Sequence, residues 1–149
     1  MEKLSKQELE ERAKGFVEGA KSRMSTRLYG MMQPRYVDCD PDNMSMTIAF
    51  PAQDWELNPT GAIHGGITVA MLDSVMGSAT HVFTGHLTPT IHIDVSFLRA
   101  GPADDEIFVR AKVEKIGRSI IYVSGETWAS SAPDKLIATA IATFKNHEE

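Results

Sequence analysis

Two adjacent glycines, Gly65 and Gly66, stand directly before a long apolar stretch of the chain, and His64 precedes them. Glycine leaves the backbone around it uncovered, and the first N–H groups of a helix have no partner inside that helix. The positive end of the helix dipole favours negative charge at the same place. A helix that begins at this pair could therefore polarise a carbonyl group and stabilise an oxyanion that develops on it.

His64 and Asn58 both precede the two glycines, and the sequence allows two interpretations of the histidine. The imidazole of His64 could transfer a proton during a reaction, or it could hold the loop in place by a hydrogen bond, and geometry decides between them. We favour the role in fixing the loop. Asn58 stands before Pro59, a pair that is typical of a turn.

Asp73 is the only carboxylate in the apolar stretch of residues 67–83. A charge that is buried without a partner is costly, so such a group needs a hydrogen-bond partner or a displaced pKa. Asp73 is therefore a candidate for general-base or nucleophilic chemistry. The alternative is a structural aspartate that accepts hydrogen bonds from the N–H groups of a neighbouring loop, and the sequence alone leaves both open.

Two stretches predict the helices that position these residues. Residues 3–27 carry apolar side chains at helical spacing among interspersed acids and bases, which predicts an amphipathic N-terminal helix with a solvated outer face. Ser5 and Glu8 have the spacing of a capping box at its start. Residues 67–83 are too short and too polar for a membrane span, so they predict a buried helix.

Six stretches of alternating or β-rich sequence predict strands, and Pro51 ends the second of them. They are residues 29–38, 44–50, 90–97, 107–113, 120–128 and 136–144. Strict alternation at residues 44–50 and 90–97 predicts one buried face and one wet or functional face for each strand. Turns are expected at residues 40–43 and 117–119, and the last turn at Pro133 and Asp134. This order of elements predicts an α+β domain in which an antiparallel sheet covers the central helix.

Composition and charge restrict the function. The 149 residues suit one domain, and 15 Lys and Arg against 20 Asp and Glu give a net charge of −5, which disfavours nucleic acid and anionic membranes as partners. Cys39 is the only cysteine, so neither an internal disulfide nor a paired-cysteine zinc site is possible. The five histidines lack zinc-site spacing, so we expect no metal. The charged N-terminus has no apolar core of a secretion signal, which favours a cytoplasmic location.

The spacing of Asn58, residues 64–66 and Asp73 resembles that of the hotdog-fold acyl-CoA thioesterases of the phenylacetate-pathway type, the PaaI-like proteins. Their signature is an asparagine a few residues before a His-Gly-Gly loop, then a helix with an acidic residue two turns in. The resemblance extends over about residues 36–144, including the runs at 95–99 and 115–119. The chain departs from many relatives after Arg99, where Ala100 and Gly101 precede Pro102.

The resemblance implies a hotdog fold, with an extra N-terminal helix at residues 1–27 and a single thioesterase domain at residues 28–146. It implies a homo-oligomer, a dimer or a dimer of dimers (a homotetramer), in which two sheets run on as one and each active site lies between subunits. The substrate would be an acyl-CoA thioester with water as the second substrate. No cofactor is expected, because CoA is part of the substrate.

The resemblance also implies a role for each site residue. The Gly65 N–H would hold the thioester carbonyl, and the partner subunit's Asp73 would act as nucleophile or as general base on water. Thr90 would orient Asp73 or the water, Asn58 would help to position them, and His64 would support the loop and the carbonyl. Arginine offers paired donors to phosphate. The candidates for substrate binding are Gly66, Arg99 and Arg118.

Two other functions remain open. A hotdog dehydratase or hydratase of acyl thioesters would use His64 and Asp73 for proton transfer at carbon. A non-catalytic acyl-CoA sensor would keep the pocket without hydrolysis, but Asp73 is retained and the N-terminal helix has no concentrated basic patch for DNA. The sequence leaves the acyl group, aryl or fatty, undetermined.

Overall fold

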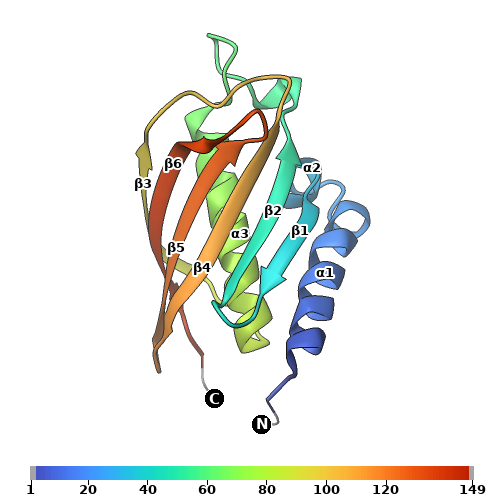
Figure 1. The fold of residues 1–149 in the computed structure, drawn as a ribbon, viewed down its shortest axis with the longest axis vertical. Helices are drawn as coiled ribbons and strands as arrows, with labels where there is room; N and C mark the ends of the chain where they lie inside the picture. The colour runs from blue at the N-terminus through green and yellow to red at the C-terminus, as the bar shows by residue number, and fades with distance from the viewer. Residues whose placement is uncertain (1–2, 148–149) are drawn as a thin grey trace.

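The computed structural model describes residues 3–147, in which a six-stranded antiparallel sheet lies against the long helix α3 (Gly65–Thr84) (Figure 1). The strands are arranged in the order β1-β2-β4-β5-β6-β3. Their bounds are β1 Arg35–Asp40, β2 Ser45–Pro51, β3 Thr90–Phe97, β4 Glu106–Ile116, β5 Ile120–Ala129 and β6 Ala132–Lys145. This is the α+β hotdog architecture that the sequence predicts.

The helix α3 is buried against the sheet because most of its side chains are apolar. Met71, Leu72, Val75 and Met76 are fully buried in the core. A Cβ on Gly125 of β5 would lie 3.1 Å from a Leu72 methyl and 3.2 Å from the Met76 sulfur, so the missing side chain lets the helix approach the strand. The expected buried helix is confirmed.

The N-terminal helix α1 (Lys6–Arg23) begins as predicted and ends earlier than expected. The Ser5 side chain accepts from the backbone of Glu8 while the Glu8 side chain accepts from the backbone of Ser5, so the capping box is confirmed. Ala13, Val17 and Ala20 are buried, and the helix lies beside β1 and contacts α3 (Figure 1). Residues 1–2 of the expected N-terminal segment lie outside the described residues.

The first expected strand is wrong over its first half. Residues 28–31 form a short helix, α2 (Leu28–Met31), and β1 starts only at Arg35. Gly30 lies so close to the Met24 carbonyl that a side chain would collide with it, so the chain turns back tightly after α1. Tyr29 of α2 packs between the rings of Phe16 and Phe50. Tertiary packing therefore overrides the β propensity of this segment.

Two further expectations about the sheet are wrong. The last turn lies at residues 130–131, and Pro133 and Asp134 belong to β6, where the pairing with β5 is irregular and a missing N–H is tolerated. The strand β2 is buried on both faces from Met46 to Phe50. Its outer residue Thr47 accepts a hydrogen bond from the Arg110 guanidinium on β4, which helps to cover that face.

The two edges of the sheet differ. The helix α1 lies beside β1, whereas β3 pairs with β6 on one side and with no other strand of residues 3–147 on the other. Ile91 and Phe97 of β3 are 54% and 53% exposed, so the face expected to be buried is only partly covered. An unpaired strand edge with apolar side chains is a template for a strand from another chain. None of the helices in residues 3–147 is long and apolar enough to cross a membrane.

Candidate active site

The start of α3 is held by His64, which occupies the N-cap position. The Nδ1 atom of His64 accepts a hydrogen bond from the Gly66 N–H at 2.9 Å, and the His64 N–H donates to the Glu56 carbonyl at 2.8 Å. The imidazole therefore holds the start of α3 through this hydrogen bond. Gly66 is occupied by this contact, whereas the Gly65 N–H has no acceptor in residues 3–147 and is free to donate to a ligand.

Asn58 shapes the loop that leads to this helix. Its side-chain oxygen accepts from the N–H groups of Thr60 and Ala62 at 3.0 and 3.1 Å, and from the Thr60 hydroxyl at 2.7 Å. Three donors on one oxygen hold a compact turn. The structure therefore supports the interpretation of Asn58 as a turn residue, and this oxygen is already engaged within the loop.

Asp73 lies two turns along α3 and contacts Thr90, the first residue of β3. The Thr90 hydroxyl donates to Asp73 Oδ1 at 2.7 Å. Asp73 is half-buried rather than enclosed, and within residues 3–147 no backbone N–H donates to it. Asp73 is therefore not a structural aspartate that accepts hydrogen bonds from the N–H groups of a neighbouring loop. A carboxylate with one oxygen held by a hydroxyl and partial access to solvent is suited to attack a carbonyl or to accept a proton from water.

The free Gly65 N–H and the Asp73 carboxylate lie at opposite ends of β3. A Cβ on Gly65 would lie 3.4 Å from the ring of Phe97, the last residue of β3, whereas Asp73 contacts the first. Asp73 follows Gly65 by eight residue steps along the helix, a rise of about 12 Å. One chain therefore cannot bring both groups to the same carbonyl carbon.

A pocket of about 330 Å³ opens beside Asp73 and Thr90, and we call it the α3 pocket. It runs along one face of α3 past Gly77 to His81, and Phe16 and Tyr29 line it as well. Burial raises the pKa of Tyr29 to about 12. This pocket was not predicted from the sequence, although Asp73, Gly77 and His81 recur at every fourth residue, a spacing that places them on one face of a helix.

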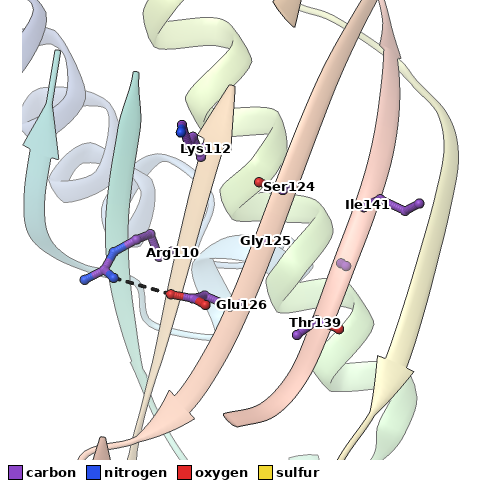
Figure 2. Close-up of a pocket in the computed structure, with 8 residues that line it drawn as sticks. Arg110, Lys112, Ser124, Gly125, Glu126, Thr139 and Ile141 are labelled. Atoms are coloured by element: carbon purple, nitrogen blue, oxygen red, sulfur yellow. Dashed lines mark hydrogen bonds and ion pairs between the residues drawn. The ribbon is translucent and has the colours of Figure 1, made fainter. Parts of the chain in front are cut away.

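A larger hollow of about 420 Å³ lies on the outer face of the sheet (Figure 2). Arg110 and Glu126 form an ion pair there at 3.4 Å, and Ile141 of β6 is exposed beside them. Figure 2 shows α3 behind the sheet, on the side away from these side chains. Asp73 does not line this hollow, so we place the site in the α3 pocket.

The two arginines expected at the CoA phosphates lie at opposite ends of the sheet in one chain. Arg99 follows β3, and its Nε donates to the Leu136 carbonyl at 2.8 Å. Arg118 lies in the exposed turn between β4 and β5, at the end where β3 begins. The fold of a single chain does not bring them together.

Glu56 is a further residue that the sequence did not single out. It is fully buried, and its Oε1 accepts from the Gln53 N–H at 2.7 Å while Oε2 has no hydrogen-bond partner in residues 3–147. Burial raises the pKa of this carboxyl above its usual range. Through its backbone carbonyl it also holds His64. Within the same residues no group of three or more metal-ligating side chains is placed to hold an ion.

Comparison with protein families gives a match to the thioesterase superfamily over residues 60–133, which include the loop at His64, the helix α3 and Thr90. A phenylacetic acid degradation-related protein from Ralstonia eutropha JMP134 is 30% identical, and the match covers 85% of this chain and 98% of that protein, with a TM-score of 0.73. No curated protein sequence matches the chain.

Two other solved structures share the fold at lower identity. Thioesterase superfamily member 2 from zebra fish is 19% identical, with a TM-score of 0.77, and the match covers 96% of this chain and 99% of that one. The protein smu.793 from Streptococcus mutans UA159, solved bound to acetyl CoA, is 19% identical, with a TM-score of 0.69 and coverage of 78% and 91%. The fold, the matched residues and the relative from Ralstonia together show that the chain belongs to the thioesterase superfamily, with PaaI-related proteins among its relatives.

Proposed function

We propose that the chain is an acyl-CoA thioesterase, which hydrolyses the thioester to a free acid and CoA. The observation that carries this proposal is the Asp73 carboxylate, held by the Thr90 hydroxyl at 2.7 Å at the mouth of the α3 pocket. Structural neighbours bound to acetyl CoA and to coenzyme A, from Streptococcus mutans and Streptococcus pneumoniae, support CoA as the carrier.

The site is completed by a second copy of the chain in this proposal. Two copies that pair their free β3 edges antiparallel about a twofold axis put the Thr90 end of each strand beside the Phe97 end of the other. Asp73 of one subunit then faces the partner subunit's Gly65, which supplies the free N–H. The same pairing brings Arg99 to the end of the sheet that carries the partner subunit's Arg118, where both could meet CoA phosphates.

The Gly65 N–H donates to the thioester oxygen and stabilises the negative charge that develops on it. If Asp73 is the general base, it accepts a proton from water, the hydroxide oxygen bonds to the carbonyl carbon, and the C–S bond breaks to release CoA as its thiolate, which takes a proton. If Asp73 is the nucleophile, its oxygen displaces CoA and forms an anhydride, which water then hydrolyses to the acid. Thr90 orients the carboxylate in both routes.

Other candidates have positioning roles in this proposal. His64 and Asn58 hold the loop so that the Gly65 N–H stays at the helix start, and Gly66 completes that arrangement by its hydrogen bond to His64. We expect a cytoplasmic dimer or dimer of dimers that needs no cofactor.

Incubation of the purified protein with a panel of aryl and fatty acyl-CoAs and a thiol reagent tests the proposal. We expect free CoA to be released with at least one member of the panel. A dehydratase or hydratase would change the double bonds of the acyl chain without releasing CoA, and a sensor would bind without turnover. Release of no CoA from any member, by a protein that is folded and binds acyl-CoA, would contradict hydrolysis.

A further inference from the structure

Gly77 stands in the interior of α3 where the fold does not require a glycine. Its φ is not positive, and a Cβ there would have a single neighbour, an atom of the Phe144 ring at 3.5 Å, which is an ordinary contact. Alanine at this position would therefore fit, and it would favour the helix by about 1 kcal/mol. A residue that lowers helix stability without a packing reason points to a functional one.

The position of Gly77 supplies that reason. Asp73, Gly77 and His81 follow one another at intervals of four residues, so they lie on one face of the helix, and all three line the α3 pocket. Because Gly77 has no side chain, none projects from this position into the part of the α3 pocket between the Asp73 carboxylate and His81, which we call the passage. From Asp73 to His81 the helix rises about 12 Å.

Near His81, residues of α1 and α2 line the pocket. Phe16 of α1 packs against the His81 ring with 4.8 Å between ring centroids, and Tyr29 lies 6.4 Å from Phe16 on the same measure. Both Phe16 and Tyr29 line the pocket. These two residues lie outside residues 60–133, the segment that the family model matches.

We propose that the α3 pocket is the acyl subsite and that Gly77 and Phe16 set the length of acyl group that the protein accepts. Gly77 keeps the passage open, and Phe16 ends it about 12 Å along the helix from Asp73. Compact acyl groups, aryl or of medium length, then fit, and long unbranched fatty chains are rejected. The inference rests on the proposed function for its catalytic meaning, but it can be tested by binding alone.

Two substitutions should shift the length preference in opposite directions. The probes are non-hydrolysable S-alkyl-CoA thioethers from butyl to hexadecyl, whose affinities are measured by titration calorimetry, with kcat/KM for the matching acyl-CoAs in parallel. Phe16→Ala should raise the affinity for the next longer chains about tenfold, because two more methylenes become buried. Gly77→Ala should lower the affinity for the longest chain that the wild type binds by about tenfold, because one added methyl fills the passage. The butyl thioether should bind all three proteins equally.

Val17→Ala is the matched control, because Val17 is fully buried on α1 but does not line the α3 pocket. This variant should unfold at a lower temperature and keep the wild-type length profile. The inference is overturned if Phe16→Ala and Gly77→Ala both keep that profile, if Val17→Ala shifts it as much as Phe16→Ala does, or if no thioether binds the wild type. If Phe16→Ala does not fold, Gly77→Ala decides.

The binding series separates this inference from the proposed function. Length-dependent binding that shifts in the two variants, with no CoA release from any acyl-CoA, supports the subsite and contradicts the hydrolase. Hydrolysis with a length profile that neither variant changes supports the hydrolase and overturns the subsite.

Discussion

Among residues 3–147 the half-buried side chain of Asp73 has one hydrogen-bond partner, the neutral Thr90 hydroxyl, and this environment suits the role proposed for it. The Thr90 hydroxyl fixes one carboxylate oxygen and leaves the other available. The sequence could predict that this carboxylate is special, because it interrupts an apolar helix. Residue types and periodicity could not show which side chain would hold it, since β3 follows α3 only after a loop whose path depends on tertiary packing, and only the family resemblance pointed to Thr90.

Asp73→Asn should leave the fold intact and lower kcat on the order of a hundredfold or more. The amide has the shape of the carboxylate and can still accept from Thr90, but it can neither attack the thioester nor take a proton from water. The measurement is steady-state CoA release, with the exposed Asp38→Asn as a control for the change of charge. A folded Asp73→Asn protein with near-normal kcat would remove Asp73 from the mechanism.

Thr90→Val should lower kcat about tenfold or more, because a hydrogen bond to a charged group contributes about 1.5 to 3 kcal/mol. Thr90→Ser keeps the hydroxyl and should restore most of the activity. Comparing kcat and KM for the two variants separates a role in orienting Asp73 from a general loss of packing. Equal losses of kcat in Thr90→Val and Thr90→Ser would show that activity does not depend on the Thr90 hydroxyl.

At the scale of elements, the loop from Asn58 to the start of α3 could be predicted from the sequence. Its turn, its N-cap and its free N–H groups all involve residues that are near neighbours in the chain. The limits of α3 and β3 were predictable from hydrophobic periodicity for the same reason. The short helix α2, the doubly buried β2 and the contact of Phe16 with His81 depend on segments that are distant in the chain. Periodicity carries no information about such contacts.

Glu56 makes the stability of this loop depend on pH. Because burial raises its pKa above the ordinary value of 4.5, the folded protein binds this proton more tightly than the unfolded chain does. The stability that Glu56 contributes is fully present below the ordinary pKa of the unfolded chain. It is lost as the pH rises through the raised pKa of the folded protein. Glu56→Gln keeps an acceptor for the Gln53 N–H without a charge, so its Tm should fall less than that of the wild type as pH rises above 4.5.

Thermal unfolding of both proteins across this pH range checks the expectation, and the exposed Glu18→Gln variant controls for the loss of one charge. Parallel curves for Glu56→Gln and wild type would mean that Glu56 is ionised in the folded protein.

At the scale of the whole molecule, the proposed assembly through the free edge of β3 would account for the separation of Gly65 from Asp73 within one chain. Gly65→Pro deletes the proposed oxyanion donor and is compatible with the fold, since proline is favoured at the first position of a helix and His64 already has an extended ψ of 133°. The loss of one such donor costs about 2.7 to 4 kcal/mol in other enzymes. Gly65→Ala keeps the N–H and should retain more activity than Gly65→Pro.

Mixing inactive Asp73→Asn and inactive Gly65→Pro protomers, and allowing them to exchange, should recover activity, because each mixed dimer contains one site with both groups intact. Up to about half of the native activity per mixed dimer is expected if the two sites act independently. Native mass spectrometry confirms that mixed dimers have formed. No recovery in their presence would mean that each site is built within one chain.

The glycine in the interior of α3 also bears on how this protein would respond to laboratory evolution. Alanine at position 77 is compatible with the packing and should raise the melting temperature, so a screen for heat resistance alone would select it. The same change narrows the passage beside Asp73. Variants enriched by such a screen should thus be more robust but restricted to smaller substrates, and a screen that alternates heat challenge with turnover of the longest accepted thioester should retain the glycine.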